Sequence, residues 1–302
     1  MNARARRVLD WYGRHGRAAL PWRTVRDPYR TLVSEFMLTQ TQVDRVVPKF
    51  AAFVARFPDV AALAGASRAD VLREWKGLGY NSRAVRLHRL AQTLVAQYGG
   101  RVPSETAALR ALPGIGPYAA AAIRAFAFNL EDAPVDTNVR RIMNRVFFGL
   151  EYPRCAPPRE LDEHARALVP SGRAHDWNSA LMDLGATICT ARAPKCSICP
   201  LRSACAAAPV DAAALERLRA AALRPRSGER VPFERTARFA RGRIVDRLRD
   251  LPPGERISLM DLHRDVGAAI SAGSLDDVRA FVAALERDGL VSHDGTHVAL
   301  RE

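Results

Sequence analysis

Four cysteines near residue 200 offer the most specific chemistry in this sequence. Their spacing is Cys189-x6-Cys196-x2-Cys199-x5-Cys205, and the fifth cysteine, Cys155, stands apart. Four thiolates at short fixed spacing can hold a 4Fe–4S cluster, and four cysteines also suit tetrahedral zinc. Zinc sites usually contain two close pairs separated by a longer gap, whereas this spacing has one close pair. The pattern therefore favours an iron–sulfur cluster, with zinc as the alternative.

Two carboxylates stand at positions where they could do chemistry. Asp136 lies at the expected start of a helix in the segment Pro134–Arg141, where by itself it is typical of an N-cap. Glu35 lies inside an otherwise apolar helix, where an unpaired carboxylate costs free energy, and a salt bridge to a core arginine is the alternative. We expect desolvation to raise the pKa of Glu35 above its ordinary value of about 4.3.

A glycine-containing turn precedes an alanine-rich helix in the segment Leu112-Pro113-Gly114-Ile115-Gly116-Pro117-Tyr118. Glycines two residues apart allow a tight turn and a close approach to a partner. The free N–H groups at the start of the next helix would form an anion site suited to a phosphate. An ordinary turn between two helices is the alternative reading of this segment taken by itself.

The charge balance indicates a polyanionic partner. The chain of 302 residues has 46 Lys and Arg against 32 Asp and Glu, which gives a formal net charge of +14. Such an excess favours nucleic acid. The sequence contains no run of about 20 apolar residues, so we expect no membrane span. The N-terminus lacks the apolar core of a secretory signal. We therefore expect a cytoplasmic, nucleoid-associated protein without a membrane partner.

The chain reads as an all-α domain over residues 1–208, a linker over 209–232, which includes the Arg- and Pro-containing stretch 224–230, and a small domain over 233–302. Apolar residues recur at helical spacing in the first domain. The expected helical segments there are Tyr29–Phe57, Val60–Trp75, Ala84–Tyr98 and Ala119–Phe128.

The C-terminal pattern predicts three helices and a hairpin, the arrangement of a winged helix. Ser258 and Ser274 are expected to cap two of these helices, and Asp294-Gly295 is a strong turn signal between two short strands. The expected elements are helices over Thr236–Leu248, Leu259–Val266 and Leu275–Arg287 and strands over Leu290–Ser292 and His297–Leu300.

Taken together, these motifs resemble the helix-hairpin-helix DNA glycosylases over residues 5–208. The cysteine spacing, the Leu-Pro-Gly-Ile-Gly turn and the Val-Asp-x-Asn segment all occur in that family. The chain also resembles the adenine glycosylase branch of that family in the stretches Leu20–Arg23, Asp27–Tyr29, Ser34–Leu38, Gly77–Tyr80 and Leu181–Gly185.

The resemblance implies catalytic roles for particular side chains. Asp136, with Asn138 beside it, would stabilise the positive charge that develops on the sugar, and Glu35 would protonate the departing base. The target nucleotide would first leave the stack. Relatives that also cut the backbone have a lysine where this chain has Tyr118. We therefore expect a monofunctional enzyme that leaves an abasic site.

The resemblance also implies a monomer that contacts double-stranded DNA containing a mismatched or damaged base. Adenine opposite guanine or oxidised guanine is the first expectation for the target. Thymine or uracil opposite guanine, or another damaged base, is the alternative, because Asn81 replaces the second aromatic of the usual Gly-Leu-Gly-Tyr-Tyr. A non-catalytic DNA-binding regulator is a distant alternative. The expected DNA contacts are Gln40, Tyr80, Asn81, Arg83, Gly114, Gly116 and Lys195.

Overall fold

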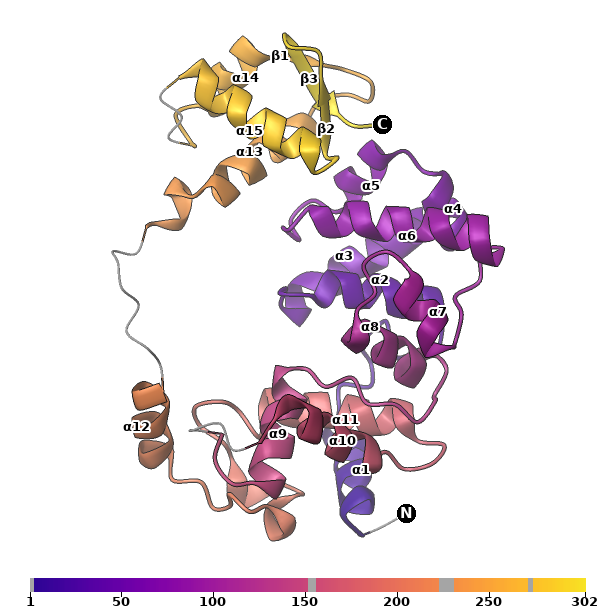
Figure 1. The fold of residues 1–302 in the computed structure, drawn as a ribbon, viewed down its shortest axis with the longest axis vertical. Coiled ribbons are helices and arrows are strands. Elements are labelled where there is room, and N and C mark those ends of the chain that lie inside the picture. Colours follow the sequence, from indigo (N-terminus) through magenta and orange to yellow (C-terminus); the bar gives the residue numbers. More distant parts are fainter. Residues whose placement is uncertain (1–2, 152–155, 223–230, 271–273) are drawn as a thin grey trace. The chain divides into compact units, whose positions relative to one another are not determined.

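The computed structural model describes residues 3–151, 156–222, 231–270 and 274–302. Cys155 and stretch 224–230 of the predicted linker lie outside the described residues. The chain divides into two compact units (Figure 1). The first unit comprises Met1–Thr31, Pro103–Ala111 and Ile115–Arg226, and the second comprises Leu32–Val102, Leu112–Gly114 and Ser227–Glu302.

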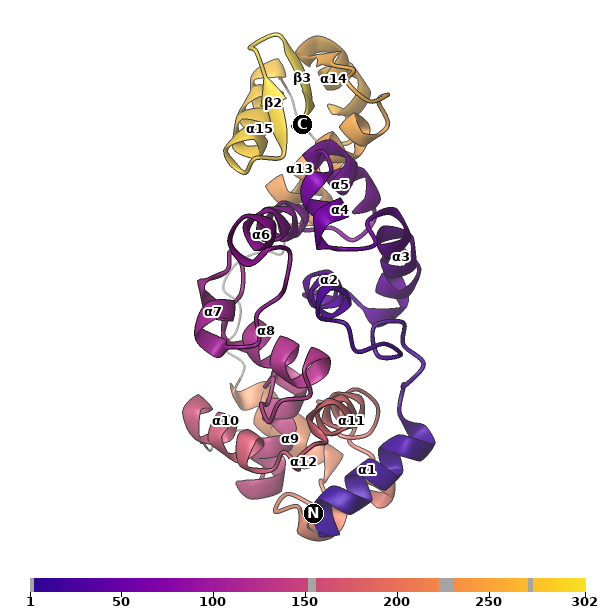
Figure 2. The same ribbon diagram turned by 90° about the vertical axis from the view of Figure 1, so that its right-hand side faces the viewer.

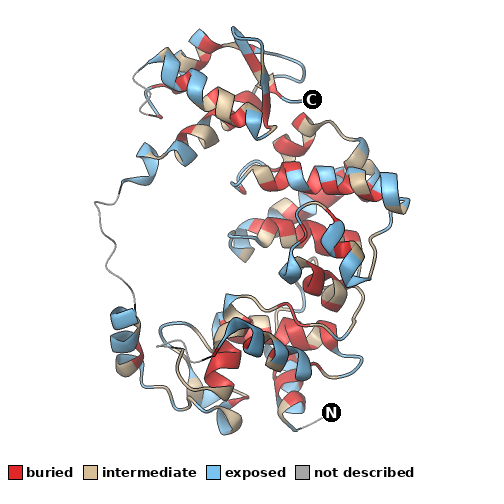
Figure 3. Cartoon of the chain, in the orientation of Figure 1, coloured by how far each residue is buried: buried red, intermediate tan, exposed pale blue. Residues whose placement is uncertain are grey.

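The first unit is helical and has α11 at its centre, packed against α1 and α9. Trp177 and Leu184 on α11 are buried, and Figure 3 shows this burial along the helix. Gly185 leaves room for a neighbour, since a Cβ atom there would lie 2.6 Å from that of Asn138. The elements of this unit are α1 (Ala3–His15), α7 (Thr106–Ala111), α8 (Pro117–Ala122), the π-helix η1 (Ile123–Ala127), α9 (Thr137–Phe147), α10 (Pro158–Ala167), α11 (Ala174–Thr187), the 3-10 turns η2 (Cys196–Ile198) and η3 (Arg202–Ala204), and α12 (Ala212–Ala222).

The second unit begins with five helices, each of which buries apolar side chains. Helix α6 packs on α4 and α5, as Figure 2 shows. The sequence predicted longer segments than the structure contains, because left-handed backbone at Gln40 and an N-cap at Ser67 interrupt them. The helices are α2 (Pro28–Leu38, which starts in the first unit), α3 (Val43–Arg56), α4 (Val60–Gly65), α5 (Arg68–Glu74) and α6 (Ser82–Tyr98).

The C-terminal part of the second unit contains the helices and the hairpin predicted for a winged-helix-like domain. Ser258 and Ser274 cap their helices as expected, each accepting a hydrogen bond from a backbone N–H three residues on. The short strand β1 was not predicted, and it completes an antiparallel sheet of order β1-β3-β2. The elements are η4 (Phe233–Arg235), α13 (Ala237–Arg249), β1 (Ile257–Ser258), α14 (Leu259–Val266), α15 (Leu275–Arg287), β2 (Val291–His293) and β3 (His297–Leu300). The predicted fold class is confirmed.

This C-terminal part packs on α5 within the second unit. Arg249 Nε donates to the carbonyl oxygen of Leu72 at 2.7 Å, and Arg68 Nη1 donates to that of Gly289 at 3.1 Å. Residues 209–232, predicted as a linker, include α12. The domain boundaries expected from the sequence stay a prediction. No helix among the described residues is long and apolar enough to span a membrane.

A buried ion pair ties the N-terminal segment to α11 in the first unit. The side chain of Asp183 is 1% exposed and contacts Arg17 Nη2 at 2.7 Å and Arg23 Nη1 at 2.8 Å. Burial disfavours the charged carboxylate, but Arg23 and Arg17 outweigh it, so the pKa of Asp183 lies below its ordinary value. The segment after α1, which contains Arg17 and Arg23, is therefore held by the buried carboxylate of Asp183.

We expect Asp183→Asn to lower the free energy of unfolding by about 3 kcal/mol, because it leaves two guanidinium groups beside a neutral side chain. Urea titrations of the variant and of the parent chain measure this. The native pKa is depressed, so the stabilisation is full above about pH 4 and disappears as the pH falls through the native pKa. Glu163→Gln, which breaks an exposed pair with Arg159, is the control and should cost under about 0.5 kcal/mol. Equal losses in the two variants would contradict this account.

Candidate active site and iron–sulfur site

Asp136 is the N-cap of α9, and both of its carboxylate oxygens are held. Oδ1 accepts a hydrogen bond from the backbone N–H of Val139 at 2.7 Å, as the sequence predicted. Oδ2 accepts one from Asn138 Nδ2 at 2.9 Å. The carboxylate is half-buried and lies at the positive end of the helix dipole. These contacts fix its orientation.

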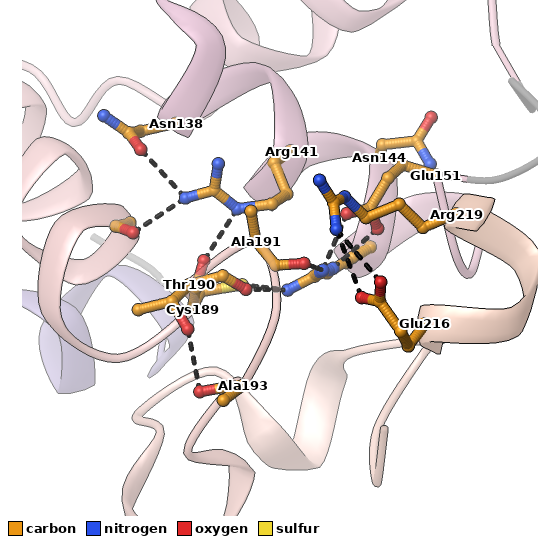
Figure 4. A network of polar contacts seen from close by, with 12 residues as sticks. Asn138, Arg141, Asn144, Glu151, Cys189, Thr190, Ala191, Ala193, Glu216 and Arg219 are labelled. Atoms are coloured by element: carbon orange, nitrogen blue, oxygen red, sulfur yellow. Dashed lines mark hydrogen bonds and ion pairs between the residues drawn. The ribbon is translucent and has the colours of Figure 1, made fainter. Parts of the chain in front are cut away.

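Arg141 connects the Asp136 environment to the cysteine loop (Figure 4). Its Nη2 donates to Asn138 Oδ1 at 2.8 Å and to the Gly185 carbonyl oxygen at 2.7 Å. Its Nε donates to the Cys189 carbonyl oxygen at 2.8 Å. One guanidinium therefore joins α9, α11 and the start of the cysteine loop. Arg141 lies three residues after Asn138, at helical spacing, but its residue type alone gave no sign of this role.

The four predicted cysteines come together around one small pocket, which Arg145 also lines. Arg145 is 1% exposed and donates to the Thr190 carbonyl oxygen at 2.8 Å, while its Nη1 lies 3.6 Å from Cys189 Sγ. Burial opposes its charge, but Glu151 and Cys189 outweigh this and raise the pKa of Arg145. A fixed positive charge thus lies beside the sulfurs. The four cysteines are Cys189, Cys196, Cys199 and Cys205, all half-buried and free of disulfides.

These side chains fit an iron–sulfur cluster. Burial raises the pKa of the Cys199 thiol to about 11 and that of Cys205 above its ordinary value. Thiolates at such positions need a cation, which coordinated iron supplies. Across the described parts of the chain, no three His, Cys, Asp or Glu side chains are placed to hold a single metal ion.

Glu35 and Gln40 lie along and just beyond α2 in the second unit. Glu35 is half-buried between the buried residues Ser34 and Phe36. Gln40 is exposed and has a φ of 59°, an unusual backbone conformation for a residue other than glycine. The turn therefore presents the Gln40 side chain to solvent at a fixed position.

Arg83 holds this turn and the turn at Tyr80 together. Its Nη1 donates to the carbonyl oxygens of Phe36, Met37 and Thr39, and its Nη2 donates to that of Gly79. Such backbone contacts stabilise the positive φ of Gln40 and of Tyr80, which is 46°. Arg83 is 6% exposed, and burial lowers its pKa to about 10. Its side chain is buried under the turns that it supports, which gives Arg83 a role in the fold, and its contact with DNA stays a prediction.

Asn81 follows Tyr80 and is bound by the C-terminal part of the same unit. Its Oδ1 accepts a hydrogen bond from Arg249 Nη2 at 2.8 Å. Arg249 is 7% exposed and also pairs with Asp246. The side-chain amide of Asn81 therefore anchors α13. The sequence did not indicate this contact, because Asn81 and Arg249 are 168 positions apart.

The predicted glycine turn has the expected backbone. Gly114 has a φ of 84°, and a Cβ atom there would lie 3.3 Å from the Phe36 ring, so only glycine fits easily. Gly116 is the N-cap of α8, and Pro117 occupies the first position of that helix. Tyr118 is 37% exposed at the following position. Lys195 is exposed on the cysteine loop.

Comparisons with known proteins agree with this arrangement. Residues 33–171 match the HhH-GPD superfamily base excision DNA repair proteins, and residues 189–205 match the iron–sulfur binding domain of endonuclease III. The adenine DNA glycosylase of Mycolicibacterium smegmatis is 42% identical over 80% of this chain and 79% of that relative. The adenine DNA glycosylase of Buchnera aphidicola subsp. Baizongia pistaciae is 37% identical over 66% of this chain and 56% of that relative.

A solved structure described as a thermostable thymine-DNA glycosylase superposes with a TM-score of 0.62 and 34% identity. It covers 67% of this chain and 93% of that chain. The match at residues 189–205 confirms the predicted iron–sulfur cofactor. From the relative matched over four fifths of its length and from both family matches, we conclude that this chain belongs to the HhH-GPD superfamily of base excision DNA repair proteins.

Proposed function

We propose that this protein is a monofunctional DNA glycosylase that removes adenine from a mismatch with guanine or oxidised guanine. The observation that carries this proposal is the carboxylate of Asp136, held at the N-terminus of α9 by Val139 and Asn138. A fixed, charged carboxylate is the group that a glycosidic cleavage requires. The names of two relatives, both adenine DNA glycosylases, support adenine as the base.

In the proposed mechanism, the two carboxylates have different tasks. Asp136 stabilises the positive charge that develops on the sugar as the bond to the base lengthens. Glu35 protonates a nitrogen of the base, which then leaves as a neutral molecule. Water attacks the sugar and leaves an abasic site. Tyr118 occupies the position at which a lysine could form a Schiff base, so we expect no cleavage of the backbone.

The cysteines and the turns would position the DNA for this reaction. Cys189, Cys196, Cys199 and Cys205 hold the 4Fe–4S cluster, whose contribution is to cross-link the loop. The exposed backbone of Gly114 and Gly116 suits a phosphate, and Lys195 on the loop adds positive charge. Gln40, fixed at its turn, is the side chain that we propose to fill the space left by the flipped nucleotide.

Removal of thymine or uracil opposite guanine is the second candidate function. Two observations favour it, namely the match to a thymine-DNA glycosylase structure at 34% identity and the asparagine at position 81. An aromatic residue at that position would stack on a base, and a stack of that kind contributes about 1–3 kcal/mol. The turn of this chain uses Asn81 to bind Arg249 instead.

We expect Asp136→Asn and Glu35→Gln each to slow base excision at least about 100-fold, because each removes a charge or a proton that the transition state needs. Single-turnover rates on a mismatched duplex measure this, and the affinity for that duplex should change little. Asp10→Asn, an exposed acid on α1, is the control. Rates within about threefold of the parent in both variants would exclude the proposed roles.

We expect the purified protein to release adenine opposite guanine or oxidised guanine, and to cut the strand only after alkali treatment. The duplexes to compare contain adenine opposite each of these bases, thymine or uracil opposite guanine, and hypoxanthine. Borohydride trapping tests for a Schiff base. Inactivity on both adenine substrates would remove adenine as the target, and a trapped covalent complex would show a lyase.

A further inference from the structure

A pocket of about 550 Å³ lies inside the second unit, beside the turn at Tyr80. One part of the wall is the turn itself, a second is α13 with the preceding turn at Phe233, and a third is formed by Leu285, Asp288 and Leu290. Its volume falls within the range of about 300–1,000 Å³ that is usual for small organic ligands. Tyr80 and Asn81, two of the expected DNA contacts, line it, but the mechanism proposed above gives the pocket itself no role.

Aromatic rings and a guanidinium group form the surface of the pocket. Tyr80 and Phe233 are 38% and 52% exposed, which is unusual for large aromatic residues. The Arg238 guanidinium carbon lies 3.7 Å from the centre of the Tyr80 ring and 5.6 Å from that of Phe233. Phe239 packs edge-on against Phe233 and holds its ring. Planar surfaces of this kind stack on nucleobases.

Charged groups of both signs line the pocket. Asp246 and Asp288 pair with Arg249 and Arg241 respectively, and Arg241 lies in the lining together with Arg238 and Arg243. The carboxylates can accept hydrogen bonds from the amino and imino groups of a base, and the arginines can bind a neighbouring phosphate. The pocket therefore suits a planar base that carries hydrogen-bond donors and belongs to a polyanionic chain.

Gly242 opens the floor of the pocket. It lies in the middle of α13, where glycine costs about 1 kcal/mol relative to alanine. No packing requires it, because a Cβ atom there would meet no atom within 4 Å. The absence of a side chain lets a flat ligand approach the helix backbone.

We propose that this pocket binds one unstacked nucleobase of the DNA, stacked on Tyr80, Arg238 and Phe233. The proposal rests on the proposed glycosylase function and deepens it, since it assigns the C-terminal part of the chain a role in reading DNA beside the excised base. A base in this pocket is a second recognised base, distinct from the one whose glycosidic bond breaks.

The test measures binding by the full-length protein with its cluster, in an Asp136→Asn background. Phe233→Ala removes a stacking ring, and Gly242→Leu fills the pocket. Both should weaken the affinity for the mismatched duplex about 5- to 150-fold. The controls make the same kind of change outside the pocket. Arg235→Ala alters the exposed turn next to Phe233, and Gly13→Leu adds a side chain to α1 where no atom lies within 4 Å. Both controls should bind within about twofold of the background.

A series of duplexes identifies the bound base. In each one, a single nucleotide is replaced by an abasic analogue, either opposite the target or at one of the two positions on each side. For one such duplex the two pocket variants should bind as well as the background protein, because the base that they fail to hold is missing. If their deficit persists on every duplex, or if they show none, the pocket binds no DNA base.

A last experiment measures whether the protein binds free deoxyadenosine or deoxyguanosine. Saturable binding of a free nucleoside that Gly242→Leu abolishes, without any effect in the abasic series, would make the pocket a small-molecule site and overturn the proposal. The affinity for the duplex is measured without base excision, so this test of the pocket works even if the protein excises no base. Failure of the proposed function and failure of this inference are therefore distinguishable.

Discussion

The structure of the first unit depends on the hydrogen bonds that α9 makes through its polar face. Asp136 caps the helix, Arg141 lies five residues after it, and Arg145 lies one turn beyond Arg141. Arg141 reaches both Asn138 and the backbone of Cys189, while Arg145 lies beside the Cys189 sulfur. A buried guanidinium without acceptors would be costly, so the loop and the helix stabilise one another. The carboxylate and the cysteine loop are thereby parts of one rigid arrangement.

The second unit uses buried arginines in a comparable way. Arg83 stabilises two left-handed turns through backbone carbonyl oxygens, and Arg249 joins α13 to Leu72 and Asn81. In a chain with 46 basic residues, some of the positive charge therefore serves the fold. Net charge predicts the class of partner, but burial decides which arginines remain available to contact it.

Features encoded locally were predictable from the sequence. The cysteine spacing indicated the cofactor, and Ser258, Ser274 and Asp136 indicated helix starts, because a cap needs only the residues next to it. Contacts between distant segments were not predictable. Asn81 carries no local sign that it accepts from Arg249, and Arg83 shows no local sign of its burial. The structural role of Arg83 was missed for this reason.

The most direct test of this account is the single-turnover excision rate of Arg141→Met, measured together with iron content. Arg140→Met is the matched control, because Arg140 lies on the same helix and pairs with Asp162 near the surface. If Arg141 orients Asp136 through Asn138, the variant with full iron content should excise at least about tenfold more slowly, while Arg140→Met keeps the parent rate. An unchanged rate in Arg141→Met with its cluster intact would contradict the central claim that the hydrogen bonds along α9 position the catalytic carboxylate.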